Sequence, residues 1–140
     1  MRLTILRMII LISVMILSCD PVFRTEVVNK THSNVLLELK FDKTEIESVW
    51  QGRPYIDYIK GVLNGGGTLL NFDTINLVSN LKISPDESFT LEGGVGVRPD
   101  FFGIKYIIVY ADDTLLLDNK DKMKKAFLET DVRKYQLILK

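Results

Sequence analysis

Alternating apolar and polar residues are the feature of this sequence that most restricts its fold. From Val35 to Phe41 every second residue is apolar, and the same period continues from Ile75 to Ile83. A strand places successive side chains on opposite faces, so a period of two predicts strands with one buried face. The core is therefore expected to be built from sheets.

Shorter stretches extend this pattern along the chain. Further strands are expected at 23–27, 46–50, 89–91, 103–111, 114–117 and 135–139. Segment 103–111 (GIKYIIVYA) is apolar at most positions, which predicts a central strand. Turn residues at 52–54, 64–67, 84–88 and 93–96 separate these segments. Seven to nine short strands at this spacing predict an all-β, immunoglobulin-like sandwich of two sheets.

Two segments have a helical period instead. Segment 54–63 (PYIDYIKGVL) has its apolar residues on one helical face, with Pro54 at a favourable first position and Asn64 and Gly65 to end the helix. Because strands surround it, a strand at Pro54–Leu63 stays open as the alternative. Segment 119–130 also has an apolar helical face. One or two short helices are therefore expected beside the sheets.

The first eighteen residues differ from the rest of the chain. Arg2 and Arg7 make the start basic, and residues 8–17 (MIILISVMIL) form an unbroken apolar run. These are the parts of a secretory signal peptide. The run is too short to cross a bilayer, which needs about 20 apolar residues. Residues 1–18 are therefore expected to be removed during export.

The apolar run leads to Cys19, the one cysteine of the chain. Residues 16–19 (ILSC) resemble the lipobox of bacterial lipoproteins. The resemblance implies cleavage before Cys19 and three acyl chains, such as palmitate, on that residue. Two anchoring signals already give stable membrane attachment, so three chains imply a permanent anchor. The alternative is a secreted protein in which Cys19 is unmodified.

Removal of the signal peptide leaves 122 residues, which fit one domain rather than two. Residues 19–21 are expected to be a lipidated end with a short tether, and residues 22–140 the sandwich domain. Loss of Arg2 and Arg7 lowers the Lys and Arg count from 18 to 16, against 18 Asp and Glu, a net charge of −2. Nucleic acid is not an expected partner, because its binding needs a basic surface.

The sequence lacks the residues that nucleophilic catalysis and metal binding require. The one histidine, His32, lies in the polar turn 29–34, and no Gly-x-Ser-x-Gly elbow is present. One histidine does not make a transition-metal site. The aspartates of 112–121 are close in sequence but do not match a calcium-binding EF-hand loop. No metal or cofactor is expected.

An enzyme is the less favoured class of function. A small hydrolase that uses two carboxylates would need them about 5–10 Å apart across a cleft, and a sequence gives no distances. The glycine-rich segments 65–67 and 93–96 match no nucleotide-binding loop and are expected to be turns. A non-enzymatic role is therefore expected, with the hydrolase kept as an alternative.

Trp50, Arg53, Tyr55 and Tyr58 are the candidate binding residues. Aromatic side chains beside an arginine can stack on sugar rings or anchor a protein partner. The favoured alternative is that Trp50 and Tyr55 fill the core, because most large aromatic residues of small domains are buried. A binding role requires the aromatic side chains to be exposed on one side of the domain.

Three strand and turn segments, 27–31 (VVNKT), 83–88 (ISPDES) and 107–113 (IIVYADD), carry a second resemblance. They resemble segments of small uncharacterised β-sandwich lipoproteins of Gram-negative bacteria. The resemblance implies architecture and identifies no active site. We expect a lipid-anchored envelope protein with a binding or structural role, whose partners are the membrane and an envelope protein or glycan. The periplasmic face of the outer membrane is favoured, with the inner membrane and the cell surface as alternatives.

Overall fold

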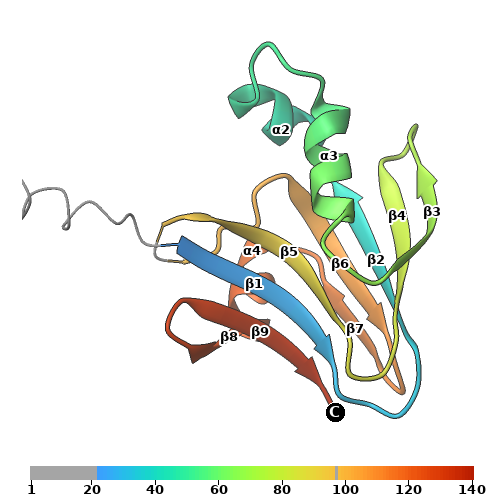
Figure 1. Ribbon diagram of the computed structural model, residues 1–140. Coiled ribbons are helices and arrows are strands. Elements are labelled where there is room, and N and C mark those ends of the chain that lie inside the picture. The colour runs from blue at the N-terminus through green and yellow to red at the C-terminus, as the bar shows by residue number, and fades with distance from the viewer. Residues whose placement is uncertain (1–21, 97) are drawn as a thin grey trace, which may run out of the picture.

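A computed structural model of the protein describes residues 22–96 and 98–140. The predicted signal peptide, Cys19 and the 19–21 tether lie outside the described residues. Within them, nine strands form two sheets, and three short helices connect strands (Figure 1). The predicted all-β sandwich of two sheets is confirmed, with one helix more than expected. No helix in the described ranges is long and apolar enough to cross a bilayer.

The strands belong to two separate sheets. Their bounds are β1 (Val22–Asn29), β2 (Val35–Phe41), β3 (Thr68–Asp73), β4 (Val78–Ile83), β5 (Ser88–Val95), β6 (Ile104–Tyr110), β7 (Thr114–Leu117), β8 (Leu128–Asp131) and β9 (Lys134–Leu139). The first sheet has the order β5-β1-β9-β8, and the second has the order β3-β4-β2-β6-β7. Among the strand pairs of residues 22–96 and 98–140, only β1 with β9 is parallel.

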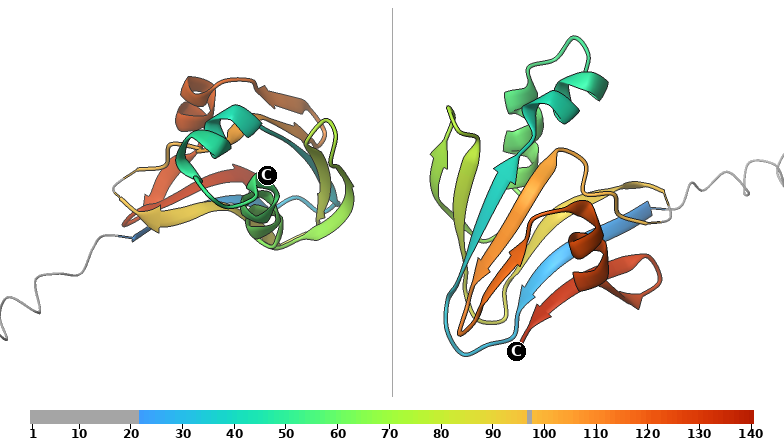
Figure 2. Two further views of the ribbon diagram at one scale, coloured as in Figure 1. Left: turned by 90° about the horizontal axis from the view of Figure 1, so that it is seen from above. Right: turned by 180° about the vertical axis from the view of Figure 1, so that it is seen from behind.

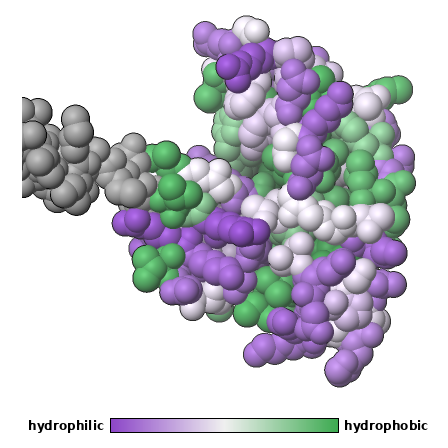
Figure 3. Space-filling model, in the orientation of Figure 1, coloured by the Kyte–Doolittle hydropathy of each residue, from purple (hydrophilic) through white to green (hydrophobic). Residues whose placement is uncertain are grey.

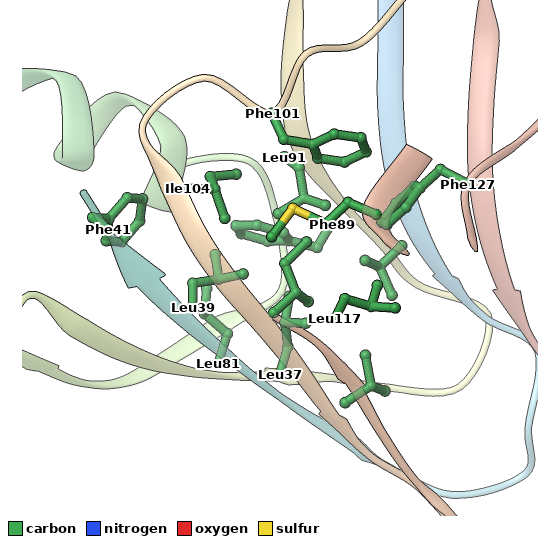
Figure 4. Close-up of a cluster of buried hydrophobic side chains, with 14 of the residues drawn as sticks. Leu37, Leu39, Phe41, Leu81, Phe89, Leu91, Phe101, Ile104, Leu117 and Phe127 are labelled. Carbon is green, nitrogen blue, oxygen red and sulfur yellow. The ribbon is translucent and has the colours of Figure 1, made fainter. Parts of the chain in front are cut away.

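The core lies between the two sheets. In β2 the side chains of Val35, Leu37 and Leu39 are fully buried, as the alternation predicts. Figure 4 shows that side chains of the second sheet, such as Leu39, meet side chains of the first sheet, such as Phe89. Each fully buried side chain of this size contributes about 1.5–3 kcal/mol. Burial of this shared face therefore holds the sheets together.

The segment predicted as a strand at 46–50 is helical, so that prediction is wrong. The helix α2 spans Lys43–Val49 and is capped by Asp42, whose side chain accepts a hydrogen bond from the Glu45 backbone N–H at 3.1 Å. Ile46 is the buried residue of α2. The apparent alternation of Ile46, Ser48 and Trp50 is too short to separate a strand from a two-turn helix.

The two predicted helices are present, in part with different bounds. The helix α3 spans Tyr55–Leu63, which settles the alternative at 54–63 in favour of a helix. The helix α4 spans Lys120–Ala126 and ends earlier than predicted, because residues 128–131 form β8. In Figure 1 and the right view of Figure 2, α2 and α3 project at one end of the sandwich.

Two predicted boundaries between strands and turns are also wrong. Gly93 and Gly94 are part of β5 and pair with β1, rather than forming the predicted turn at 93–96. The strand predicted from Ile75 begins at Val78, and Ile75 is 90% exposed in the turn between β3 and β4. The alternation from Ile75 therefore starts one turn before the strand does.

Candidate functional site

A cavity of about 570 Å³ lies where α3 meets the end of β5. Trp50, at the end of α2, and Tyr58, on α3, line one side of it. Glu92 on β5, together with Asp100 and Phe102 of the loop between β5 and β6, also contribute to its wall. Phe23 of β1 also lines the cavity, which is therefore bounded by two helices, two strands and one loop.

The aromatic side chains of this site form a row in which each ring contacts the next. The Arg53 guanidinium lies over the Trp50 ring, 5.5 Å from its centroid. Trp50 meets Tyr58 edge-on at 5.6 Å between centroids, and Tyr58 meets Phe102 edge-on at 5.3 Å. We call Trp50, Tyr58 and Phe102 the aromatic row. Such pairs contribute about 0.5–1.5 kcal/mol beyond their burial.

The Tyr58 hydroxyl connects α3 to the loop beside the cavity. It donates a hydrogen bond to the Phe102 carbonyl oxygen at 2.6 Å. Burial, reinforced by the charges of Glu92, Asp100 and Glu45, raises the pKa of Tyr58 well above its ordinary value. The hydroxyl therefore keeps its proton and acts as a permanent donor, which holds the aromatic row in place.

Glu92 and Asp100 form a carboxyl pair whose pKa values are shifted in opposite directions. Burial, followed by the hydrogen bond with Asp100 and the charge of Asp100, raises the pKa of Glu92. The hydrogen bond from Glu92 lowers the pKa of Asp100. Glu92 thus holds the proton and donates it to the Asp100 carboxylate, an arrangement typical of two carboxyl groups too close to ionise together. We call these residues the acid pair.

Backbone hydrogen bonds attach the acid pair to the loop. A Glu92 carboxyl oxygen accepts from the Phe101 backbone N–H at 3.1 Å, and Asp100 accepts from the Phe102 N–H at 3.0 Å. Phe101 itself is fully buried and has a left-handed φ of 56°. A bulky residue keeps that costly conformation only where its surroundings enforce it. The loop is therefore held in one shape by β5.

A second set of contacts fixes the same loop from the side of α2. The Lys120 Nζ donates to Glu45 at 2.9 Å and to the Phe101 carbonyl at 2.5 Å. Glu45 also accepts a hydrogen bond from the Gly103 N–H at 2.9 Å. Gly103 has a φ of 69°, and a Cβ there would lie 2.7 Å from Ile46, so this position requires glycine. Contacts from β5, α2 and Lys120 therefore all hold the loop that forms this part of the cavity wall.

The structure brings together three of the four predicted binding residues. Trp50 and Tyr58 line the cavity, and Arg53 stacks on Trp50. Tyr55 is not among the lining residues; the Lys43 Nζ lies 4.8 Å from its ring centroid. All three aromatic side chains are half-buried against the core, so the exposure that a binding role requires is met only in part, and the alternative that Trp50 and Tyr55 pack on the core is also met in part. Trp50 and Tyr58 also face the cavity.

The structure also describes the surroundings of His32 and the arrangement of the acidic residues. His32 is exposed in the turn between β1 and β2. Within residues 22–96 and 98–140, no three His, Cys, Asp or Glu side chains are grouped so that they could hold a metal ion. The two carboxyl groups of the acid pair lie within hydrogen-bonding distance, which is closer than the about 5 Å or more required in glycoside hydrolases.

The acid pair and Phe102 were not among the residues predicted from the sequence. Glu92 lies in a strand and Asp100 in a loop eight positions later, so no periodic pattern relates them. The turn residues Arg98, Pro99 and Asp100 mark only the bend between β5 and β6. The loop becomes part of the site because Glu92 accepts a hydrogen bond from the backbone of Phe101. No local sequence pattern predicts that contact.

Similarity to other proteins adds no assignment. The chain matches no protein-family model, no curated protein and no solved structure.

Proposed function

We propose that this protein is a lipid-anchored binding protein of the bacterial cell envelope, and that its cavity binds a short glycan without cleaving it. The observation that carries this proposal is the aromatic row beside the acid pair in one cavity. Aromatic rings stack on the apolar faces of sugars, and carboxyl groups bind sugar hydroxyls. A cavity of this volume lies within the usual range of about 300–1,000 Å³ for small-molecule sites.

The charges around the cavity favour an uncharged or weakly cationic glycan. Asp57 and Asp100 bring negative charge to the wall, Arg98 brings positive charge, and Glu92 holds its proton near neutral pH. Because this proton is already donated to Asp100, the acid pair presents oxygen lone pairs to a ligand, and these accept hydrogen bonds from sugar hydroxyls. The acid pair is therefore suited to recognise hydroxyl groups rather than phosphate or sulfate.

Binding is favoured over hydrolysis by the spacing of the acid pair. Glycoside hydrolases place the scissile bond between two carboxyl groups about 5–10 Å apart. Glu92 and Asp100 are hydrogen-bonded to each other, so no sugar bond fits between them. The small hydrolase that the sequence leaves open thus has less support than a binding protein.

Ligand binding can be followed through Trp50, the one tryptophan of the chain. We expect its fluorescence to change when the protein is titrated with chitotriose, cellotriose or soluble peptidoglycan fragments. Tyr58→Ala should weaken binding about tenfold, because it removes one ring of the aromatic row. Tyr55→Ala is the matched control, since Tyr55 is on the same helix outside the cavity. Equal losses in both variants, or no response to any saccharide, would contradict glycan binding.

The lipid anchor has its own test. Cells grown with a clickable fatty acid should incorporate the label into the wild-type protein and not into Cys19→Ala. Unchanged labelling of the variant, or mass spectrometry that finds Cys19 bare, would contradict the anchor. Cross-linking in intact cells, followed by identification of the bound envelope material, would then assign the membrane and the face.

A further inference from the structure

We infer that one end of the first sheet, formed by Val22, Val95 and Val132, rests on the lipid surface of the bilayer. We call these three residues the valine end. Their exposed fractions are 66%, 69% and 82%. Single exposed apolar residues are common on proteins, whereas several that gather at one place indicate an interaction site.

The strand pairing brings these three residues together. Val22 at the start of β1 is the register partner of Val95 at the end of β5. On the other side of β1, the Arg24 backbone N–H donates to the Arg133 carbonyl at 3.0 Å, which places the turn that holds Val132 beside the start of β1. Figure 1 shows the start of β1 and the β8–β9 turn at the same end of the sheet, and Figure 3 shows hydrophobic patches at this end with hydrophilic surface between them.

The distance to Cys19 points to lipid as the occupant. This step rests on the proposed anchor. Three residue steps separate Cys19 from Val22, and a fully extended chain spans at most about 3.6 Å per residue. An acylated Cys19 therefore holds Val22 within about 11 Å of the residue that carries the acyl chains. The valine end is then the part of the described domain that the tether keeps nearest to the bilayer.

The local charges indicate that this contact is apolar rather than electrostatic. Arg24 and Lys134 both lie against the buried carboxylate of Glu26, at 2.6 Å and 3.6 Å. Asp131 and Arg133 flank Val132 with opposite charges. The named charges at this end sum to only +1, with Arg24, Arg133 and Lys134 against Glu26 and Asp131. The contact therefore does not require anionic lipid, and vesicles of phosphatidylcholine alone should support it.

A single environment-sensitive label tests the inference in the lipidated protein. Because Cys19 is the one native cysteine and its thiol is acylated in the anchored form, a new cysteine takes an NBD fluorophore selectively. In phosphatidylcholine vesicles, NBD on Val132→Cys or Val95→Cys should emit at shorter wavelength and be quenched several-fold less by iodide than in the controls. The controls are His32→Cys, in the turn at the far end of β1, and Ile75→Cys, an exposed apolar residue in another turn.

Co-flotation of the protein with the vesicles reports the anchor separately. Co-flotation with water-like emission at 132 and 95 overturns the inference and leaves the anchor intact. Failure to co-float refutes the anchor and the inference together. A blue shift that disappears below one protein per vesicle assigns the valine end to a second copy of the chain and also overturns contact with lipid.

Discussion

Replacement of Glu92 by glutamine is expected to remove most of the change in stability between pH 5 and pH 8. In the folded protein, burial and then the Asp100 contact raise the pKa of Glu92 from 4.5 to about 8. In the unfolded chain the carboxyl group returns to its ordinary value. Between these two values the folded state binds more protons than the unfolded state, so the stability of the wild type falls as pH rises.

The size of the effect follows from the pKa shift. Each pKa unit corresponds to about 1.36 kcal/mol, so the full shift of Glu92 would correspond to about 5 kcal/mol. Water in the adjoining cavity screens the group, and we expect about 2–4 kcal/mol. The contribution is complete below pH 4.5 and lost by about pH 8. Asp100 has a lowered pKa, so its own contribution changes only below its ordinary value and outside this window.

Urea unfolding followed by Trp50 fluorescence at several pH values measures this difference. In Glu92→Gln the amide can still donate to Asp100 and accept from the Phe101 N–H, so packing is retained while titration is lost. The unfolding free energy of the variant should therefore be nearly constant from pH 5 to pH 8. Glu47→Gln, on the exposed side of α2, is the control and should follow the wild type. Parallel pH profiles for wild type and Glu92→Gln would refute the reasoning.

Three further substitutions test the scaffold around the cavity by the same urea assay. Tyr58→Phe removes the hydrogen bond to the Phe102 carbonyl and should lower the unfolding free energy by about 1 kcal/mol; no change would show that water replaces the hydroxyl. Gly61→Ala, inside α3 with open space at the Cβ position, should raise stability by about 0.5–1 kcal/mol. Gly65→Ala should be strongly destabilising, because its Cβ would overlap the Thr90 carbonyl oxygen. Equal stability of the two alanine variants would contradict the backbone packing described at Gly65.

The parts of the fold that could be predicted are those in which one face is buried, because apolar residues then recur at the period of a strand or a helix. The strand 35–41 and the helix 54–63 each place apolar residues on one face, and both are present. The strands β3 and β8 were not predicted, because neither contains a buried residue and so neither shows an alternation. Neither Leu69 of β3 nor Leu128 of β8 is buried.

The misassigned helix α2 shows which local signal carries more weight than a short alternation. Asp42 followed three residues later by Glu45 is a helix N-terminal pattern, and the Asp42 side chain does cap the first turn. Capping is a specific hydrogen bond, whereas alternation over five residues arises easily by chance. Only part of the candidate site could be predicted. Trp50 and Tyr58 could be proposed because they are aromatic residues close to Arg53 in the sequence, whereas the acid pair depends on a tertiary contact.

The parallel pairing of β1 with β9 has a consequence for how the chain reaches its native state. The Gln136 amide donates to Glu26 across 110 positions of sequence, and β1 lies between β5 and β9. During synthesis, β1 emerges early and must wait for β9 before its second edge is covered. Closing so long a loop is slow, so we expect the nascent domain to stay open, and susceptible to proteases, until its final strand has emerged.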